Sequence, residues 1–117
     1  MQDLTLETIL SIHDAILTKD GGDSRMLSEG NLNQLVFRAN LVDDVRKRAA
    51  FVFYSLCVFP VFREGNRRTA CQLTKVILES GGYHADMPCE GLRGLARGID
   101  AFTVEIEDVE QVLCRHG

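Results

Sequence analysis

The fold of this chain is decided by one stretch of sequence, Ala49-Ala50-Phe51-Val52-Phe53-Tyr54-Ser55-Leu56-Cys57-Val58. The residues just before it carry a polar face at helical spacing: Asp43, Asp44, Arg46, Lys47 and Arg48. That face ends where the stretch begins, and a helix that is apolar on every side lies in the interior of a protein. The pattern therefore predicts a central buried helix over residues 42–58, which ends before Pro60 because proline disfavours helical angles at the preceding residue.

Further helices are predicted on both sides of this stretch. A second core helix runs from about Arg67 to Ser80 and is ended by Gly81-Gly82. Near the N-terminus, apolar residues recur at three- and four-residue steps: Leu6, Ile9, Leu10, His13, Ile16 and Leu17. Asp3 or Thr5 would cap that helix. A polar loop over residues 20–28, a short helix over residues 30–38 and a turn over residues 40–43 complete the N-terminal half.

The C-terminal part gives a weaker pattern. A helix over residues 88–98 would contain three glycines, each costing about 1 kcal/mol relative to alanine, and a brief strand-like alternation covers residues 101–106. A last helix is predicted over residues 104–116. Because helical patterns cover most of the chain, we expect an all-α fold, and because no internal repeat or domain boundary is visible, we expect a single domain. It would be a compact single-domain helical bundle over residues 1–117, with the motif loop between its two core helices.

Composition limits the function classes. The chain has 117 residues, of which 45% are apolar and 26% charged, as in a globular domain. Its net charge of -4 argues against direct nucleic-acid binding or membrane-surface binding, which need a basic excess. No apolar run reaches the roughly 18 residues of a membrane span, and the start lacks a signal-peptide pattern, so a cytoplasmic protein is expected. The four scattered cysteines, Cys57, Cys71, Cys89 and Cys114, are expected to be reduced.

The loop between the two core helices carries the candidate chemistry. The residues Gly65-Asn66-Arg67-Arg68 open a helix whose first N–H groups lack carbonyl partners and carry partial positive charge. Anions bind such helix starts. Gly65 lets a ligand approach the main chain, Asn66 offers an amide donor, and Arg67 with Arg68 can hold phosphate oxygens. These residue types together predict a phosphate-binding loop.

Glu64 adds a carboxylate of the kind that Mg²⁺ takes together with substrate phosphates. A plain turn before a helix has the same spacing, so a loop with no ligand stays open as an interpretation. Arginine in the first turn of a helix is mildly unfavourable with the helix dipole. Two adjacent arginines therefore favour an external anion or a nearby acid.

The stretch Phe62-Arg63-Glu64-Gly65-Asn66-Arg67-Arg68-Thr69-Ala70 resembles the signature loop of the Fic/Doc (Fido) family, His-Pro-Phe-x-Asp/Glu-Gly-Asn-x-Arg. Its Arg-Thr-Ala ending is most similar to the Doc, or death-on-curing, branch. The resemblance extends to Ile12-His13-Asp14-Ala15-Ile16 with Gly21-Gly22, and to Leu78-Glu79-Ser80-Gly81-Gly82-Tyr83. It is strongest over residues 4–85.

The resemblance implies a helical protein that transfers AMP or a phosphoryl group from ATP or another nucleotide, with Mg²⁺, to a hydroxyl of a target protein. Doc-type proteins are toxins of toxin–antitoxin pairs, so an antitoxin protein is an expected partner. The implied roles are these: Phe62 is a buried anchor, Glu64 the magnesium ligand, Gly65 and Asn66 phosphate contacts, and Arg68 the charge stabiliser. Arg67 occupies the variable place in the motif.

One departure from the family pattern concerns the general base. The family's histidine falls at Pro60, and the final arginine of AMP-transferring motifs falls at Cys71. General-base assistance contributes about 10²–10⁴-fold, so we expect degenerate catalysis that rests on Arg68 and Glu64. His13 lies on an apolar helix face, where a core histidine is the expected role. Neither His84 nor His116 has a sequence reason to reach the loop.

Three function classes remain open on the sequence. The first is a Doc-like toxin or nucleotide transferase with weak catalysis. The second is a catalytically inactive Fic-fold binding or regulatory protein. The third is a helical interaction module in which the loop has no ligand.

Overall fold

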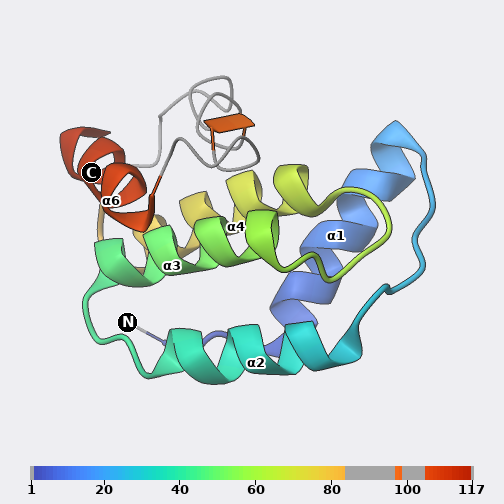
Figure 1. The fold of residues 1–117 in the computed structure, drawn as a ribbon, viewed down its shortest axis with the longest axis horizontal. Coiled ribbons are helices and arrows are strands. Elements are labelled where there is room, and N and C mark those ends of the chain that lie inside the picture. Colours follow the sequence, from blue (N-terminus) through green and yellow to red (C-terminus); the bar gives the residue numbers. More distant parts are fainter. Residues whose placement is uncertain (1, 84–96, 99–104, 117) are drawn as a thin grey trace.

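Helix α3 (Val45–Val58) is the centre of the fold. Its packing partners are α4 (Asn66–Ser80), α6 (Ile106–His116) and α2 (Glu29–Asn40), while α1 (Leu6–Asp20) packs on α4 and α2. The computed structural model describes residues 2–83, 97–98 and 105–116 (Figure 1). Within these ranges there is no β-strand, and the prediction of a compact all-α fold is confirmed.

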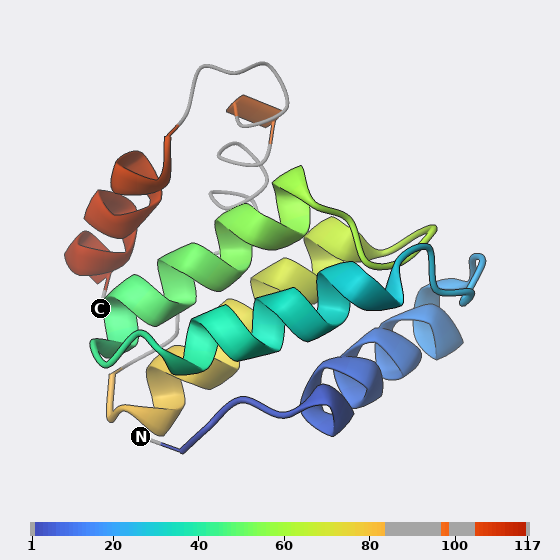
Figure 2. The ribbon, with the colours of Figure 1, turned by 60° about the horizontal axis from the view of Figure 1, so that its bottom comes forward.

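The predicted central helix is buried, as expected. Ala49, Ala50, Val52 and Leu56 are fully buried and Phe53 is 1% exposed. Figure 2 shows α2, α3 and α4 running side by side, with α1 on the outside of this group. Among the described residues, no helix is long and apolar enough to cross a membrane.

Arg48 corrects one sequence expectation. Its spacing predicts a position on the polar face of α3, but only 3% of it is exposed. Its Nε donates to the Val42 carbonyl at 3.0 Å, Nη1 to the Gln2 carbonyl at 3.1 Å, and Nη2 to the Asn40 carbonyl at 3.4 Å. The Gln2 carbonyl lies on the N-terminal segment. The Asn40 and Val42 carbonyls lie at the end of α2, where the helix dipole is negative. The buried Arg48 side chain therefore connects α3 by hydrogen bonds to the end of α2 and to the N-terminal segment.

The helix starts divide into two kinds. Thr5, Ser28 and Asp44 cap α1, α2 and α3, each accepting a hydrogen bond from a backbone N–H in the first turn. Such caps are worth about 1 kcal/mol. Helix α4 begins after Gly65, which has φ 85°, and no side chain caps it. The uncapped start is the one that the sequence singled out.

Two predicted elements lie largely outside the described residues, namely the helix over residues 88–98 and the alternation over residues 101–106. The last helix, predicted over residues 104–116, is α6.

Candidate functional site

The loop between α3 and α4 is anchored through Phe62. This side chain is 1% exposed and stacks on the ring of His13 from α1, with ring centroids 3.5 Å apart and an angle of 8° between the ring planes. The loop also pairs with the segment before α2: Leu27 N–H donates to the Val61 carbonyl at 2.7 Å, and Arg63 N–H to the Arg25 carbonyl at 3.1 Å. The position of the loop is thus fixed by segments far away in sequence.

Asn66 ties the loop to the start of α4. Its Oδ1 accepts from the N–H groups of Val61 and Phe62, both at 3.0 Å, and its Nδ2 donates to the Phe62 carbonyl at 2.7 Å. The sequence predicted that the Asn66 amide would contact phosphate. In this structure the amide bonds the protein's own backbone, so its main effect is to hold the loop closed.

Gly65 is required by its surroundings. Its positive φ favours glycine, and a Cβ added there would lie 3.3 Å from Cδ2 of His13 and 3.3 Å from Cδ2 of Leu17. Within the described residues, the N–H groups of Gly65, Asn66 and Arg68 have no hydrogen-bond acceptor. The start of α4 therefore presents unpaired donors.

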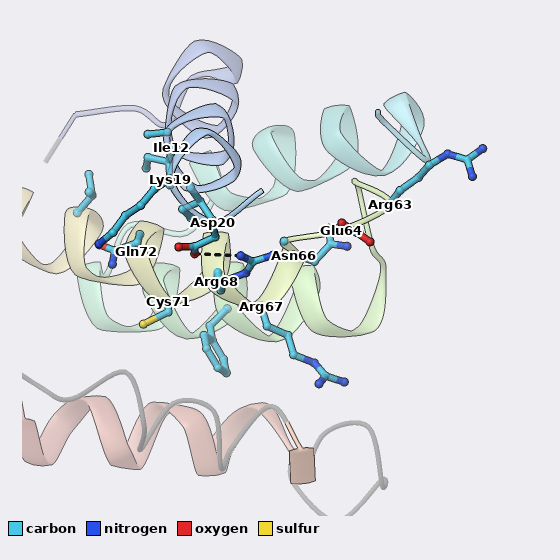
Figure 3. Close-up of a pocket in the computed structure, with 15 residues that line it drawn as sticks. Ile12, Lys19, Asp20, Arg63, Glu64, Asn66, Arg67, Arg68, Cys71 and Gln72 are labelled. Carbon is cyan, nitrogen blue, oxygen red and sulfur yellow. Dashed lines mark hydrogen bonds and ion pairs between the residues drawn. The ribbon is translucent and has the colours of Figure 1, made fainter. Parts of the chain in front are cut away.

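A cavity of about 950 Å³ lies against this helix start (Figure 3). Part of its wall is apolar and comes from α1, α3 and α4: Ile12, Ala15, Ile16, Phe53, Cys71 and Val76. Its charged lining consists of Lys19, Arg63, Arg67 and Arg68 with the carboxylates of Asp20 and Glu64. Four cations and two carboxylates give +2 in a chain whose net charge is -4. The cavity is thus a basic site on an acidic protein.

The two arginines of α4 point to different sides. Arg68 turns toward α1, where Nη1 bonds Oδ2 of Asp20 at 3.0 Å, and Arg67 points away from that pair (Figure 3). The side chains of Arg68 and Asp20 are 38% and 43% exposed, so the ion pair is accessible to solvent. Both arginines line the cavity, but they do not converge on one point, as a bidentate clamp would require.

Glu64 is exposed, and one of its carboxylate oxygens is already bonded. Its Oε2 accepts the Asp23 N–H at 2.7 Å, and a Cβ at Gly22 would collide with the same oxygen. The guanidinium of Arg25, whose Nη2 bonds Oδ2 of Asp23 at 2.7 Å, lowers the pKa of Asp23 well below its usual range. The turn that approaches Glu64 thus carries its own ion pair.

A magnesium ion beside bound phosphates needs only one or two ligands from the protein. No group of three or more candidate ligands occurs among the described residues. Mg²⁺ in nucleotide sites takes one or two carboxylates and completes its shell with phosphate and water. Glu64 lines the cavity and keeps Oε1 for such an ion, so the residues present fit a single-carboxylate site.

No imidazole lines the cavity among the described side chains. Pro60, at the position of the family's histidine, does not line it either, and its carbonyl accepts a hydrogen bond from Nδ2 of Asn31 at 3.0 Å. His13 is 3% exposed and Nε2 donates to the Glu64 carbonyl at 2.8 Å, which agrees with the predicted core role. His84 and the side chain of His116 lie outside the described part of the chain.

The expectation that all cysteines are reduced is wrong for Cys71. Cys71 is disulfide-bonded. Cys57 is a free thiol, and burial raises its pKa to about 11, so it is protonated at neutral pH. Cysteine spacing gave no signal for a disulfide because pairing depends on distances in the folded chain.

Some cavity residues had no sequence signal. Lys19 and Asp20 end α1, and they meet the start of α4 only because α1 packs on it. Charged residues at the end of an amphipathic helix are common on protein surfaces, so nothing local marked them as part of a site.

Comparison of the chain with descriptions of known protein families found no matching family, and a search of curated proteins found no match. The resemblance to the Fic/Doc family therefore rests on the residues quoted above.

Proposed function

We propose that this protein is a Fic/Doc-like protein that binds the phosphates of a nucleotide at the start of α4, with degenerate catalysis. One observation carries the proposal: the uncapped N-terminus of α4 borders a basic cavity. At the starts of α1, α2 and α3, a side-chain oxygen accepts from one of the first N–H groups. A phosphate would take that role at α4.

The cavity suits a phosphate ester better than a small inorganic anion. Its volume of about 950 Å³ lies within the range of about 300–1,000 Å³ that is typical of small-molecule sites. Phosphates would lie near Gly65 and Arg68, while the apolar wall of Ile12, Ile16 and Val76 would face the rest of the ligand. A nucleotide, with an anionic end and a flat base, combines both properties.

The chemistry proposed is slow transfer to a protein hydroxyl of AMP from ATP, with pyrophosphate leaving, or of a phosphoryl group, with the remaining nucleotide leaving; the hydroxyl proton passes to water. Arg68 would neutralise charge on the phosphates, and Glu64 would hold Mg²⁺ through Oε1. Bound Mg²⁺ would supply neutralisation of phosphate charge. Because proline has no proton acceptor in its side chain, Pro60 removes about 10²–10⁴-fold of general-base assistance.

The alternative is a catalytically inactive binding or regulatory protein with the same ligand. Pro60 and the lack of imidazole in the described cavity lining favour it. In either form the proposal includes a toxin–antitoxin relationship, with an antitoxin as partner, and action in the cytoplasm. Disulfides are rare in that compartment, so the state of Cys71 in protein purified from cells bears on the location.

Calorimetric titration with ATP and Mg²⁺ tests the binding proposal. Arg68→Ala should weaken ATP binding about 10- to 100-fold, because hydrogen bonds to charged groups are worth about 1.5–3 kcal/mol. Arg38→Ala is the matched control, since Arg38 is an exposed arginine on α2 that does not line the cavity. If the native protein shows no ATP binding at millimolar concentration, the proposal is wrong.

Restoring the histidine separates the two forms of the proposal. Pro60→His should give protein modification or growth arrest if loss of the base alone keeps the site inactive. If the native protein already transfers a labelled group from ATP, and Arg68→Ala abolishes that transfer, the weak-enzyme form is correct. If both the native protein and Pro60→His bind ATP without transferring any group, the inactive form is supported.

A further inference from the structure

We propose that His13 is the positioning residue of the phosphate-binding loop: it turns the Glu64–Gly65 peptide so that the Gly65 N–H faces the cavity. This inference rests on the proposed function. It gives a role to a buried imidazole that the proposed chemistry does not use.

Three contacts join His13 to the loop. Nε2 donates to the Glu64 carbonyl at 2.8 Å, across 51 residues of sequence. The ring stacks on Phe62. Gly65 lies directly against the ring edge, where an added Cβ would be 3.3 Å from Cδ2 and 3.4 Å from Nε2. These contacts reach three of the four residues that precede α4.

The hydrogen bond fixes the direction of one peptide group. A carbonyl oxygen can only accept, so the proton of this bond belongs to Nε2 of His13. In a planar trans peptide the C=O and the following N–H point in opposite directions. With the Glu64 oxygen held toward His13, the Gly65 N–H is directed away from His13. Gly65 borders the cavity and His13 does not, so this donor is aimed at the ligand side.

The same peptide direction sets the start of α4. Gly65 precedes Asn66, and the N–H groups of Gly65, Asn66 and Arg68 have no acceptor among the described residues. Neighbouring backbone N–H groups at a turn before a helix can form a concave anion site. Without the His13 bond the Glu64–Gly65 peptide could rotate, and its carbonyl oxygen would then face the phosphates and repel them.

His13 acts through the peptide and not on the ligand. It is 3% exposed, and Nε2 is already bonded. It is therefore a positioning residue and not a replacement for the missing base at Pro60.

Two substitutions separate positioning from packing. His13→Leu keeps apolar contact with Phe62 and removes the donor, whereas His13→Gln keeps an N–H near the place of Nε2. Ile9→Ala is the matched control, because Ile9 is fully buried one turn earlier on α1 and does not line the cavity. Inorganic tripolyphosphate and Mg²⁺-ATP are the probes, titrated at a temperature where every variant is folded.

His13→Leu should weaken binding of both probes at least about tenfold, while His13→Gln stays within about threefold of the native protein. Ile9→Ala should lower the melting temperature and leave both affinities unchanged. The inference is overturned if folded His13→Leu binds both probes as the native protein does, or if Ile9→Ala weakens binding equally.

Amide hydrogen exchange tests the same inference without a ligand. Exchange over residues 62–66 should be faster in His13→Leu than in the native protein and in His13→Gln. If the native protein binds neither probe, the proposed function fails, and exchange alone decides whether His13 holds the loop. Equal exchange over residues 62–66 in all variants would overturn the positioning role.

Discussion

Helices α3 and α4 both begin with basic residues in their first turn, yet the two starts differ in every contact. At α3, Asp44 caps the backbone by accepting the Lys47 N–H at 3.0 Å, and Arg48 is buried against three carbonyls. At α4, no side chain caps the backbone, and Arg68 is 38% exposed beside a cavity. The first start thus has a side-chain cap and a buried arginine, whereas the second has no side-chain cap and a partly exposed arginine.

The two starts distinguish a structural arginine, Arg48, from a candidate ligand-binding one, Arg68. Both starts are similar in sequence, with two arginines within three residues. What separates them is burial: the guanidinium of Arg48 is buried and bonds three carbonyls, whereas that of Arg68 is partly exposed beside a cavity. A partly exposed guanidinium can contact a ligand, and a buried one cannot.

The largest effect is expected for Arg48→Met, which should lower the free energy of unfolding by about 3 kcal/mol because the three backbone carbonyls that accept from the buried guanidinium lose their donors. Urea denaturation measures this loss. The control Arg38→Met changes an exposed arginine and should stay within about 0.5 kcal/mol. Equal free energies of unfolding for the two variants would show that the hydrogen bonds of Arg48 do not stabilise the fold.

Asn66→Ala should cost about 2 kcal/mol in the free energy of unfolding, because its side chain makes three hydrogen bonds to the loop backbone. ATP affinity should fall with it, since the loop that precedes α4 is no longer held. Asn33→Ala, at an exposed position of α2, is the control in both measurements. A stable Asn66→Ala variant with native affinity would contradict the role in closing the loop.

Asp44→Ala should cost about 1 kcal/mol, the usual effect of losing a helix cap. Asp43→Ala, one residue earlier and also exposed, tests whether loss of charge alone has this effect. Thermal melts of both variants provide the measurement. Equal shifts in melting temperature would show that the Asp44 cap adds nothing beyond its charge, so that α3 and α4 would not differ in capping.

The smallest effect is expected for Asp20→Asn. The Asp20–Arg68 pair is partly exposed, and such pairs contribute about 0–1 kcal/mol. Stability should barely change, whereas ATP affinity should rise up to about fivefold because Arg68 no longer has a competing carboxylate. Asp14→Asn, on the same helix and outside the cavity lining, should change neither. A lower affinity in Asp20→Asn would show that Asp20 helps to bind the ligand.

Local signals predicted most of the fold. The helix over residues 42–58, its end before Pro60, and a cap at Thr5 follow from short-range patterns, and the structure places them within a few residues. The motif loop was also located correctly between the two core helices. These features depend on neighbours within one or two helical turns.

Long-range contacts could not be predicted in the same way. Arg48 is buried because residue 2 returns to it across 46 positions, and Glu64 bonds Asp23 across 41. Arg68 pairs with Asp20 across 48. A single sequence carries no information about such pairs, because charged residues at surface-like spacing look the same whether or not a partner folds against them.

The span of these contacts bears on how the protein folds. Contacts that join residues 41 to 51 positions apart require closure of long chain loops, which is entropically unfavourable until the helices have docked. We therefore expect the loop before α4 to become ordered after the folding transition state. Saturating ATP should then slow unfolding in stopped-flow experiments and leave the refolding rate unchanged, whereas faster refolding would indicate that this loop belongs to the nucleus.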